Sequence, residues 1–451
     1  MATAIMAEAV DPSAAADGGA IHHIRDDSTG GDCPQVGIWQ PATLTCTLTT
    51  DSVDKFVIDD DYITLDGAGH SITGTGPDDP ANFVEGPDGG GDAIQIFSKT
   101  GVTIKNIDFN RFDYSVHLDH TSHSTVHNIS SSNTGLAGVS LSYSSYNTIT
   151  GNTISNQRVN TGICIGYTST NNLIEENDIL DSAYGIYVHD FGTGNIISGN
   201  SLTRCGESLT FWNRDSGNEV AGNDISGGNI GIYIHSQSNG ITVQENLLAA
   251  NAVGLLIENA SGNTIVHNSF RDNVLHISTS RAAGNSFSQP APDGGNYWSG
   301  HGPVEGCADA NIDGFCDLSY LAEGVTDSLP WVRDRGWICN KPALIVEVGL
   351  SYWGSFADYE RRLLSVDWTI RNRGPENAYD IYLTGNQSTN GVLLETPVPA
   401  LIGTLPGGAS VPFRLRFYTP ESVMSFRSVL QADATDLCGT TYSYPQPRVA
   451  P

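Results

Sequence analysis

Aromatic and imidazole side chains alternate with apolar residues in three stretches of the chain, spaced about 23 residues apart. The first stretch holds Tyr187 and His189, the second Trp212, and the third Tyr233 and His235. Because alternate side chains of a β-strand point to opposite faces, these residues are predicted to face outward while their apolar neighbours face inward. Flat rings beside titratable groups can stack on sugar rings and orient sugar hydroxyls. The pattern therefore predicts an outward surface that binds a polysaccharide or other glycan.

The rings and the polar side chains around them are predicted to fall into two groups, one that binds the substrate and one that carries out the reaction. The expected substrate-binding residues are Trp212, His235, Asn213 and Glu258. The expected catalytic residues are His189, Tyr187, Tyr233, Asp190, Asp215 and Arg214. Abstraction of a proton beside a uronate carboxylate needs a base, an acid on the other face of the sugar and a positive charge on the carboxylate. His189 or Tyr187 would be the base. Tyr233 would be the acid, and Arg214 would supply the positive charge.

Two other interpretations of the same residues stay open. A glycoside hydrolase needs two carboxyl groups about 5–9.5 Å apart. Asp190 and Asp215, on adjacent repeats, could form that pair, whereas Glu258 lies roughly 14 Å from Asp190 by strand spacing. Alternatively, β-strands favour tyrosine and tryptophan, and outward ladders of rings stabilise a sheet. The chain would then be a non-catalytic structural or adhesive protein at a cell surface or outside the cell.

An asparagine recurs about every 23 residues through the same region. Its members are Asn106, Asn128, Asn152, Asn177, Asn200, Asn223, Asn246 and Asn268. Each repeat also holds short apolar pairs at alternate positions, separated by Gly, Asn, Ser and Thr, and none shows helical periodicity. Repeats of this length with three short strands predict the coils of a parallel β-helix. We expect the asparagines to stack in one turn, each amide bonding to its neighbour one coil away.

Changes in composition and repeat pattern along the sequence predict four segments. Residues 1–31 indicate a flexible N-terminal arm, 32–290 the β-helix with an N-terminal cap, 291–338 a capping segment and 339–451 an Ig-like β-sandwich. The last segment holds roughly seven short strands separated by turn residues. Residues 76–91, rich in Gly, Asp and Pro, interrupt the coils. Insertions in solenoids lie on one face, often the binding face.

The cysteines indicate an oxidising compartment. Three pairs each bracket a local unit and are the expected disulfides: Cys33–Cys46, Cys307–Cys316 and Cys339–Cys438. Cys164, in a strand, and Cys205, in a turn, are expected to be free. Disulfides favour a secreted, extracellular or cell-surface protein. Met1–Val10 lacks the basic and long apolar stretches of a signal peptide, so we expect a mature or trimmed form.

The charge balance excludes some partners. The chain has 50 acidic and 21 basic residues and a net charge of −29. Such a charge disfavours binding to nucleic acid and to anionic membranes. No apolar run approaches the ~20 residues that a membrane-spanning helix needs.

One loop has the pattern of a calcium site. The expected ligands are Asp309, Asn311, Asp313 and Asp317. They occupy the first, third, fifth and ninth positions of a calcium loop, with Gly314 at the sixth. Tyr320 stands where a bidentate glutamate would complete the site. We expect a structural calcium ion that locks the last coils. The alternative is a metal-free turn held by Cys307–Cys316.

Several of these features resemble a known family. The asparagine repeats, Asn296-Tyr297-Trp298-Ser299 and the Asp309–Asp317 loop resemble right-handed β-helix proteins related to the periplasmic copper-processing protein NosD. That family overlaps with carbohydrate-binding and sugar-hydrolase β-helices. The resemblance covers roughly residues 55–331 and implies a right-handed parallel β-helix. It adds periplasmic copper processing as an alternative function. The residues considered for copper binding are the histidines clustered on one coil, His117, His120, His123 and His127.

Two further resemblances concern parts of the chain. Residues 184–190, Tyr-Gly-Ile-Tyr-Val-His-Asp, are similar to the Tyr-Gly-Phe-Asp-Pro-His-Asp signature of mannuronan C5-epimerases, which are also right-handed β-helices. Tyr184, His189 and Asp190 match, whereas the family's catalytic aspartate falls on Tyr187 and its proline on Val188. The resemblance implies lyase or epimerase chemistry around His189. The terminal sandwich resembles adhesion-type Ig-like modules, which implies contacts with a surface or with other copies.

Overall fold

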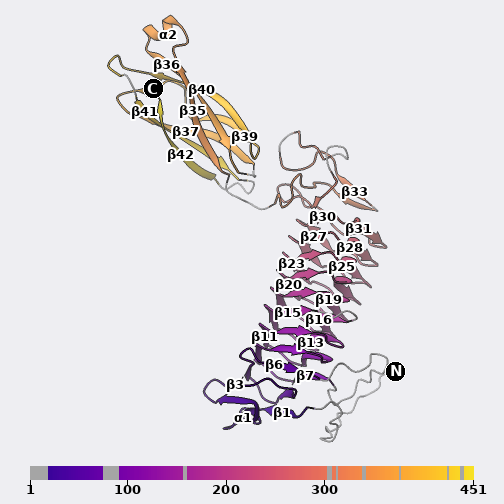
Figure 1. Cartoon of the computed structure of the whole chain (residues 1–451). Coiled ribbons are helices and arrows are strands. Elements are labelled where there is room, and N and C mark those ends of the chain that lie inside the picture. The colour runs from indigo at the N-terminus through magenta and orange to yellow at the C-terminus, as the bar shows by residue number, and fades with distance from the viewer. Residues whose placement is uncertain are drawn as a thin grey trace. The chain divides into compact units, whose positions relative to one another are not determined.

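The computed structural model shows an all-β chain with two compact units (Figure 1). The first unit comprises Met1–Gln289, Gly295–Glu305 and Ser319–Pro330, and the second comprises Pro290–Gly294, Gly306–Leu318 and Trp331–Pro451. The residues that the structure describes are 19–74, 91–155, 160–301, 307–310, 313–322, 324–337, 342–374, 377–423, 426–436 and 441–450. The first unit is the predicted parallel β-helix, so the predicted fold class is confirmed.

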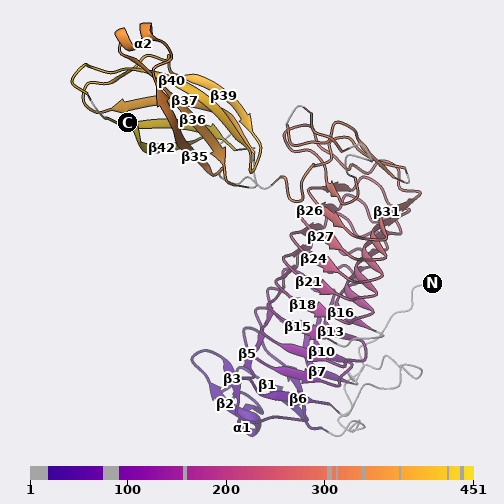
Figure 2. The same cartoon turned by 45° about the horizontal axis from the view of Figure 1, so that its top comes forward.

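Three long sheets, here called A, B and C, form the walls of the β-helix (Figure 2). The strands of sheet A are β1 (Ile21–Ile24), β4 (Lys55–Ile58), β7 (Asp92–Phe97), β10 (Tyr114–Asp119), β13 (Ala137–Ser142), β16 (Thr161–Gly166), β19 (Tyr184–His189), β22 (Glu207–Trp212), β25 (Ile230–His235), β28 (Val253–Glu258) and β31 (Leu275–Ser280). All neighbours in sheet A pair in parallel.

Sheets B and C have shorter strands. Sheet B holds β2 (Gly37–Gln40), β3 (Thr45–Leu48), β5 (Thr64–Asp66), β8 (Thr103–Lys105), β11 (Thr125–His127), β14 (Thr148–Thr150), β17 (Leu173–Glu175), β20 (Ile196–Ser198), β23 (Glu219–Ala221), β26 (Thr242–Gln244) and β29 (Thr264–Val266). Sheet C holds β6 (Ser71–Thr73), β9 (Asp108–Asn110), β12 (Ser130–Ser132), β15 (Thr153–Ser155), β18 (Asp178–Leu180), β21 (Ser201–Thr203), β24 (Asp224–Ser226), β27 (Leu247–Ala249), β30 (Ser269–Arg271) and β32 (Tyr297–Trp298).

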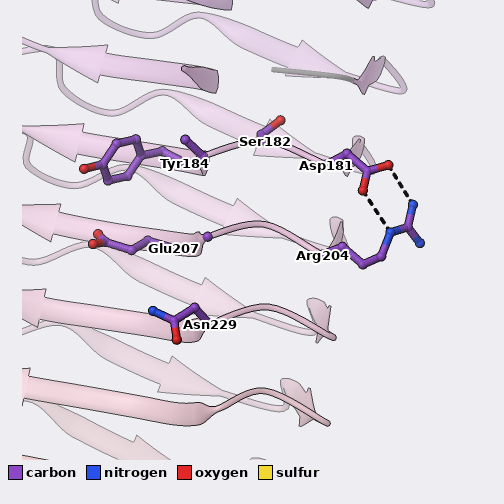
Figure 3. A pocket seen from close by; sticks show the side chains of 8 residues that line it. Asp181, Ser182, Tyr184, Arg204, Glu207 and Asn229 are labelled. Carbon is purple, nitrogen blue, oxygen red and sulfur yellow. Dashed lines mark hydrogen bonds and ion pairs between the residues drawn. The ribbon is translucent and has the colours of Figure 1, made fainter. Parts of the chain in front are cut away.

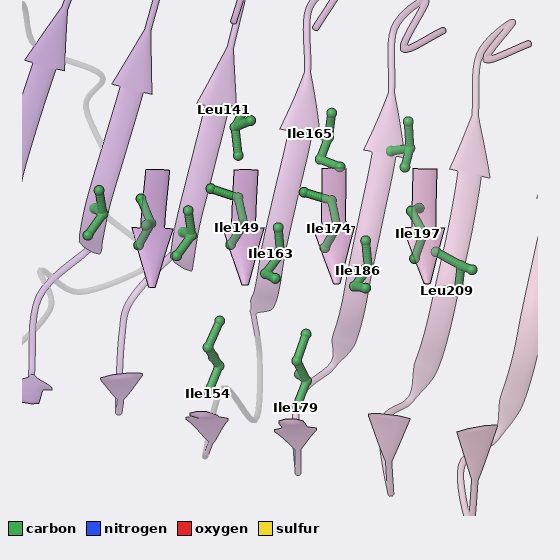
Figure 4. Close-up of a cluster of buried hydrophobic side chains, with 14 of the residues drawn as sticks. Leu141, Ile149, Ile154, Ile163, Ile165, Ile174, Ile179, Ile186, Ile197 and Leu209 are labelled. Atoms are coloured by element: carbon green, nitrogen blue, oxygen red, sulfur yellow. The ribbon is translucent and has the colours of Figure 1, made fainter. Parts of the chain in front are cut away.

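Apolar side chains from all three sheets fill the interior of the coils. Figure 4 shows apolar side chains of successive coils in rows, for example Ile149, Ile174 and Ile197 of sheet B. Glycine precedes the inward pair of several sheet A strands because the next coil is close. A Cβ atom at Gly185 would lie 2.4 Å from the carbonyl oxygen of Ser208. This steric limit fixes which residues of each strand face inward.

A buried asparagine ladder joins the coils, as predicted. Each Nδ2 donates to the Oδ1 of the next member at 2.9–3.0 Å. The members are Asn152, Asn177, Asn200, Asn223, Asn246, Asn268 and Asn296. Asn106 and Asn128 also bond to each other across one coil, since Nδ2 of Asn128 donates to Oδ1 of Asn106 at 2.6 Å. They lie outside the buried ladder, however, one residue earlier in the turn with φ of 56° and 51°. Ile129 takes the ladder position there, since its N–H donates to Asn152.

Both ends of the β-helix differ from the predicted boundaries. Ile21–Ile24, part of the expected N-terminal arm, instead form β1, the first strand of sheet A. The cap also contains α1 (Cys33–Val36) and the predicted Cys33–Cys46 disulfide. The expected capping segment does not form one unit, because parts of it group with each of the two units.

A buried aspartate closes the C-terminal end of the β-helix. Asp327, in the hairpin of β33 (Tyr320–Ala322) and β34 (Val325–Asp327), accepts 2.8 Å hydrogen bonds from the N–H of Asn296 and from Nε1 of Trp298. Trp298 stacks between Phe270 and Tyr320. The Asn-Tyr-Trp-Ser segment is therefore the last rung of the core.

The second unit contains the predicted β-sandwich. One sheet orders β35 (Leu344–Tyr352), β36 (Leu363–Asn372), β40 (Ser410–Tyr418) and β38 (Leu393–Leu394), and the other orders β39 (Ala400–Leu405), β37 (Ala378–Ser388), β41 (Phe426–Thr435) and β42 (Thr441–Ala450). All described pairings are antiparallel. Trp368 and Leu430, one from each sheet, belong to one buried core. The short helix α2 (Phe356–Glu360) is capped by Ser355.

Two expectations fall partly or wholly outside the described residues. Cys339 and Cys438, the third expected disulfide, are not among them, and neither are residues 76–90 of the expected insertion. Among the described residues, neither short helix has the length and apolar character that a membrane-spanning helix requires.

Candidate functional site

The outward face of sheet A gathers the predicted site residues in the middle of the β-helix. Parallel pairing places His189 beside Trp212 and Trp212 beside His235 on β19, β22 and β25. Tyr187 and Tyr233 lie two residues before the two histidines. The apolar neighbours Ile186, Val188, Phe211, Ile232 and Ile234 are fully buried. The structure therefore has the predicted register, and the five outward residues are here called the aromatic patch.

The rings of the aromatic patch contact one another in one continuous row. Tyr187 lies 5.0 Å from His189 and 6.2 Å from Trp212, measured between ring centroids. Trp212 lies 6.0 Å from His235, which lies 4.1 Å from Tyr233. The interplanar angles are 27° or less, so neighbouring rings cover part of each other's faces. Trp212 keeps 46% of its surface exposed and offers a broad free surface to a ligand.

His189 is held in one orientation by the residue that follows it. Its Nδ1 lies 2.9 Å from Oδ2 of Asp190, and the other carboxylate oxygen accepts a 2.5 Å hydrogen bond from Nδ2 of Asn213. Burial alone would raise the pKa of Asp190, but the hydrogen bonds from His189 and Asn213 lower it below its ordinary value. An ionised Asp190 accepts a hydrogen bond from the N–H at Nδ1 of His189. The lone pair of Nε2 is then available to act as a base.

The Nε2 atom of His189 lies 3.5 Å from Sγ of Cys164, one coil earlier on β16. Cys164 pairs with Tyr187 in the parallel register and was expected only to be free. The structure confirms that Cys164 and Cys205 are free. The contact with His189 could not be predicted, because it depends on how far the imidazole leans across the strand.

A second proton-bearing pair lies at the other end of the aromatic patch. The hydroxyl of Tyr233 donates a 2.5 Å hydrogen bond to Oε2 of Glu258 on β28. Burial raises the pKa of Tyr233, and the adjacent Glu258 raises it further, so its hydroxyl stays protonated. Burial lowers the pKa of His235, which favours its neutral form.

Asp215 does not lie at the edge of an exposed surface, so that expectation was wrong. The residue is fully buried, and its two carboxylate oxygens accept hydrogen bonds from the N–H groups of Gly192 and Trp212. Burial raises the pKa of Asp215 to about 7. A side chain that braces a turn in this way cannot reach a glycan, so the expected hydrolase pair with Asp190 is not formed on the surface. Arg214 is exposed, and its guanidinium lies over the ring of Phe191, 5.8 Å from the centroid.

An open depression borders the aromatic patch at the beginning of the sheet A strands (Figure 3). Its volume is about 670 Å³, and its lining residues are Asp181, Ser182, Ala183, Tyr184, Arg204, Gly206, Glu207 and Asn229. Tyr184 and Glu207 lie on adjacent coils at one end, and the ion pair between Arg204 and Asp181 lies at the other. The Tyr184 ring lies 5.2 Å from that of Tyr187, which joins the depression to the aromatic patch.

Sequence reasoning missed Tyr184 and Glu207 as parts of this surface. Each is the first residue of its strand, β19 and β22, and the two are partners in the parallel register. Alternation could not reveal them, because Tyr184 and Glu207 lie two residues before the inward Ile186 and Leu209 and would be predicted to face inward too.

The described part of the expected calcium loop folds around Asp309. The carboxylate of Asp309 accepts hydrogen bonds from the N–H groups of Asp313, at 3.0 Å, and Gly314, at 3.1 Å. Asp317 accepts a 3.1 Å bond from the N–H of Ala310, and the predicted Cys307–Cys316 disulfide is present. Asn311 lies outside the described residues.

The clustered histidines do not share a ligand position. His117 pairs with Asp92, His120 pairs with Asp119, and His123 stacks on Tyr146. His127 lies on β11, in sheet B. In the described ranges, no three His, Cys, Asp or Glu side chains are placed to hold one metal ion. These residues therefore do not fit a copper centre.

A protein-family model matches most of the β-helix. The family model described as "Periplasmic copper-binding protein (NosD)" matches residues 51–229 and 213–302, which together make up more than half of the chain. Comparison by sequence with curated proteins gives no significant match.

Solved structures with a similar fold include two kinds of protein. A double mutant of the periplasmic alginate epimerase AlgG is 15% identical, with a TM-score of 0.43 over 53% of this chain and 67% of that one. DFA-IIIase from Arthrobacter chlorophenolicus A6, in complex with GF2, is 12% identical, with a TM-score of 0.41 over 51% of this chain and 65% of that one. At such identities and TM-scores, the likeness carries no argument about activity.

Proposed function

The chain belongs to the family described as periplasmic copper-binding protein (NosD), and we propose that it uses the β-helix of that family to bind and process a polysaccharide. The binding site is the outward face of sheet A, from the depression at Tyr184 across the aromatic patch to Glu258. The observation that carries the proposal is the continuous row of partly exposed rings centred on Trp212. Contiguous exposed aromatic surface on a soluble scaffold is typical of a binding site.

The shape of this face suits an extended sugar chain. Coils rise by about 4.8 Å, which is close to the length of one sugar residue in an extended polysaccharide. Trp212 supplies the apolar face for stacking, while Glu207 and Asn229 supply acceptors and donors for hydroxyls in the adjoining depression. The net charge of −29 favours a glycan with little negative charge of its own.

His189 is the proposed base of the processing reaction. Asp190 fixes its tautomer, so that Nε2 can accept a proton from the substrate. Tyr187 is a poor alternative, because burial first and the neighbouring Cys164 second raise the pKa of its hydroxyl. Tyr233 is the proposed acid, because burial and the neighbouring Glu258 raise its pKa and keep its hydroxyl protonated. Arg214 would supply positive charge for any carboxylate on the sugar.

Calcium and export complete the proposal. We propose a structural calcium ion at Asp309, Asn311, Asp313 and Asp317, because carboxylate and amide oxygens of one loop are the ligands that calcium prefers. The described carboxylates of this loop do not share one ligand position in the structure, so binding requires their side chains to turn toward the ion. The two disulfides support an exported, periplasmic or extracellular protein.

A panel of polysaccharides tests the proposed function. Binding is measured by affinity electrophoresis, and the products are assayed for unsaturated ends and for reducing ends. Unsaturated ends indicate a lyase, and reducing ends alone indicate a hydrolase. Binding without either leaves epimerisation or another reaction that preserves the chain. If no polysaccharide binds, the stacked rings only stabilise the sheet and the proposal fails.

A further inference from the structure

We propose that Cys164 is a nucleophile activated by His189, and that it cleaves acyl esters on the hydroxyl groups of the bound glycan. The choice of substrate rests on the proposed function, whereas the assignment of the nucleophile does not. The inference starts from the 3.5 Å contact between Sγ of Cys164 and Nε2 of His189.

The contact is built by the residues around it. Gly166, one coil before His189, has no side chain, and a Cβ atom there would lie 2.4 Å from Nε2 of His189. The imidazole can therefore lie over Gly166 and reach Cys164, two residues earlier on the same strand. Asp190 and Asn213 hold the imidazole from its other side. Nucleophile, base and orienting carboxylate follow one another in hydrogen-bond reach, which is the arrangement that activates thiols and hydroxyls.

The protonation states of Cys164 and His189 allow the imidazole to deprotonate the thiol as it attacks the substrate. Burial raises the pKa of the Cys164 thiol to about 12, and the charge of Asp190 adds to the shift. The thiol is thus protonated at neutral pH and needs a base to become a nucleophile. His189 has its Nε2 lone pair directed at that thiol, because its Nδ1 proton is bound by Asp190. The Cys164 thiol therefore acts as a hydroxyl nucleophile would, losing its proton to His189 as it attacks.

Tyr187 can stabilise the charge that develops during attack. It pairs with Cys164 in the parallel register of β16 and β19, and its raised pKa keeps the hydroxyl protonated. A neutral hydroxyl on the residue paired with the nucleophile can donate to the oxyanion of a tetrahedral intermediate.

The reaction balances with water as the only co-reactant. His189 takes the thiol proton while Sγ forms a bond to the carbonyl carbon of the ester. The carbon–oxygen bond to the sugar then breaks, and the sugar oxygen takes the proton from His189. Water, deprotonated by His189, next attacks the thioester. The products are a carboxylic acid, the de-esterified glycan and the free Cys164 thiol.

Esters fit this site better than glycosidic bonds do. A glycosidase needs two accessible carboxyl groups, and Asp215 is fully buried. Ester cleavage also produces neither unsaturated nor reducing ends, so assays for those ends would not detect it.

Cys205 provides an internal comparison. It is also free, but it is 1% exposed, and its nearest hydrogen-bond acceptors are the carbonyl oxygens of Ile179 and Thr203. It has no histidine contact among those that the structure describes. A thiol reaction that depends on the base should therefore modify Cys164 and spare Cys205.

Acylation by 4-nitrophenyl acetate tests the nucleophile in the full chain. The wild type should release a burst of 4-nitrophenol, and mass spectrometry should find one acetyl group on Cys164. Cys164→Ala should lose the burst. Gly166→Ala and Asp190→Asn keep the thiol but disturb its base, so acylation should slow by about 10-fold or more. Their deficit should shrink as the pH rises, because a thiolate needs no base; a merely structural defect would not.

Three results would overturn the assignment. These are no acetyl group on Cys164, equal acylation rates in the wild type and both base variants, and stoichiometric binding of Cu(I) by Cys164 without acylation. Acetylated xylan then tests the ester on a glycan by release of acetate. If the small ester acylates Cys164 but no polysaccharide binds, only the proposed function fails. If a polysaccharide binds and no acylation occurs, only the nucleophile assignment fails.

Discussion

Nδ1 of His189 lies 2.9 Å from the carboxylate of Asp190, and the two residues are adjacent in the chain. Adjacent residues of a strand normally point to opposite faces. Here Asp190 has left the strand, with φ of 58°, and its side chain turns back to the same face as His189. The dyad therefore exists because strand β19 ends at His189.

Removal of the imidazole should separate turnover from affinity. We expect His189→Ala to lower turnover on a processed polysaccharide by about 10²- to 10⁴-fold, because proton transfer is felt in the transition state. Affinity should change little, since Trp212 and Tyr233 remain. Steady-state kinetics and affinity electrophoresis check the two quantities. An unchanged turnover would remove His189 from the chemistry.

The asparagine ladder predicts a large loss of stability on Asn200→Leu. Asn200 accepts hydrogen bonds from the N–H and Nδ2 of Asn177 and donates Nδ2 to Ile174 and Asn223. Several buried polar groups would lose partners at about 1–3 kcal/mol each. Chemical denaturation should show the loss. Asn229→Leu, at an exposed asparagine, is the matched control and should melt like the wild type.

Asp215 predicts that stability falls as the pH rises. Its pKa is raised from 3.8 to about 7 in the folded protein, mainly by burial. Between these values the folded state holds a proton that the unfolded state has released. Stability from this group is full below about pH 4 and is lost as the pH rises through about 7, an effect on the order of 4 kcal/mol.

Denaturation at pH 5 and pH 8 measures this effect. Asp215→Asn cannot release a proton, so the difference in unfolding free energy between the two pH values should be smaller in the variant. Equal differences in the two proteins would mean that Asp215 is ionised throughout and held by the N–H groups of Gly192 and Trp212.

The calcium proposal predicts a melting temperature that depends on the metal. Calcium should raise the melting temperature of the chelated protein, because a ligand that binds only the folded state stabilises it. Asp313→Ala should remove most of this response. Asp178→Ala, at an exposed aspartate on β18, should keep it. Identical melting curves with and without calcium would contradict the proposal.

The fold could be predicted from the sequence because it repeats. A wrong assignment at one residue changes little, because many coils have the same strand register. The inward positions of β19, β22 and β25 were all predicted correctly. The position of Asn106 and Asn128 outside the buried ladder has a physical cause. Asparagine suits both the buried ladder and the left-handed position one residue before it, so its spacing alone cannot distinguish the two.

The site was less predictable, because its contacts depend on side-chain directions. Register placed His189, Trp212 and His235 on one surface. It could not show that Asp215 turns inward to accept two backbone N–H groups, nor that the imidazole of His189 leans across Gly166 to Cys164. These features arise in turns and in the space left by a missing Cβ atom, neither of which follows from alternation.

The affinity of Trp212→Ala for a polysaccharide tests the central claim most directly. The matched control is Tyr146→Ala, because Tyr146 is also an exposed ring, but it stacks on His123 in the turn after sheet A. We predict that Trp212→Ala weakens binding by about 1.5–3 kcal/mol, roughly 10- to 100-fold, while the control binds like the wild type. Equal affinities of the wild type and Trp212→Ala for a polysaccharide that binds would contradict the account, because the binding surface would then lie elsewhere on the chain.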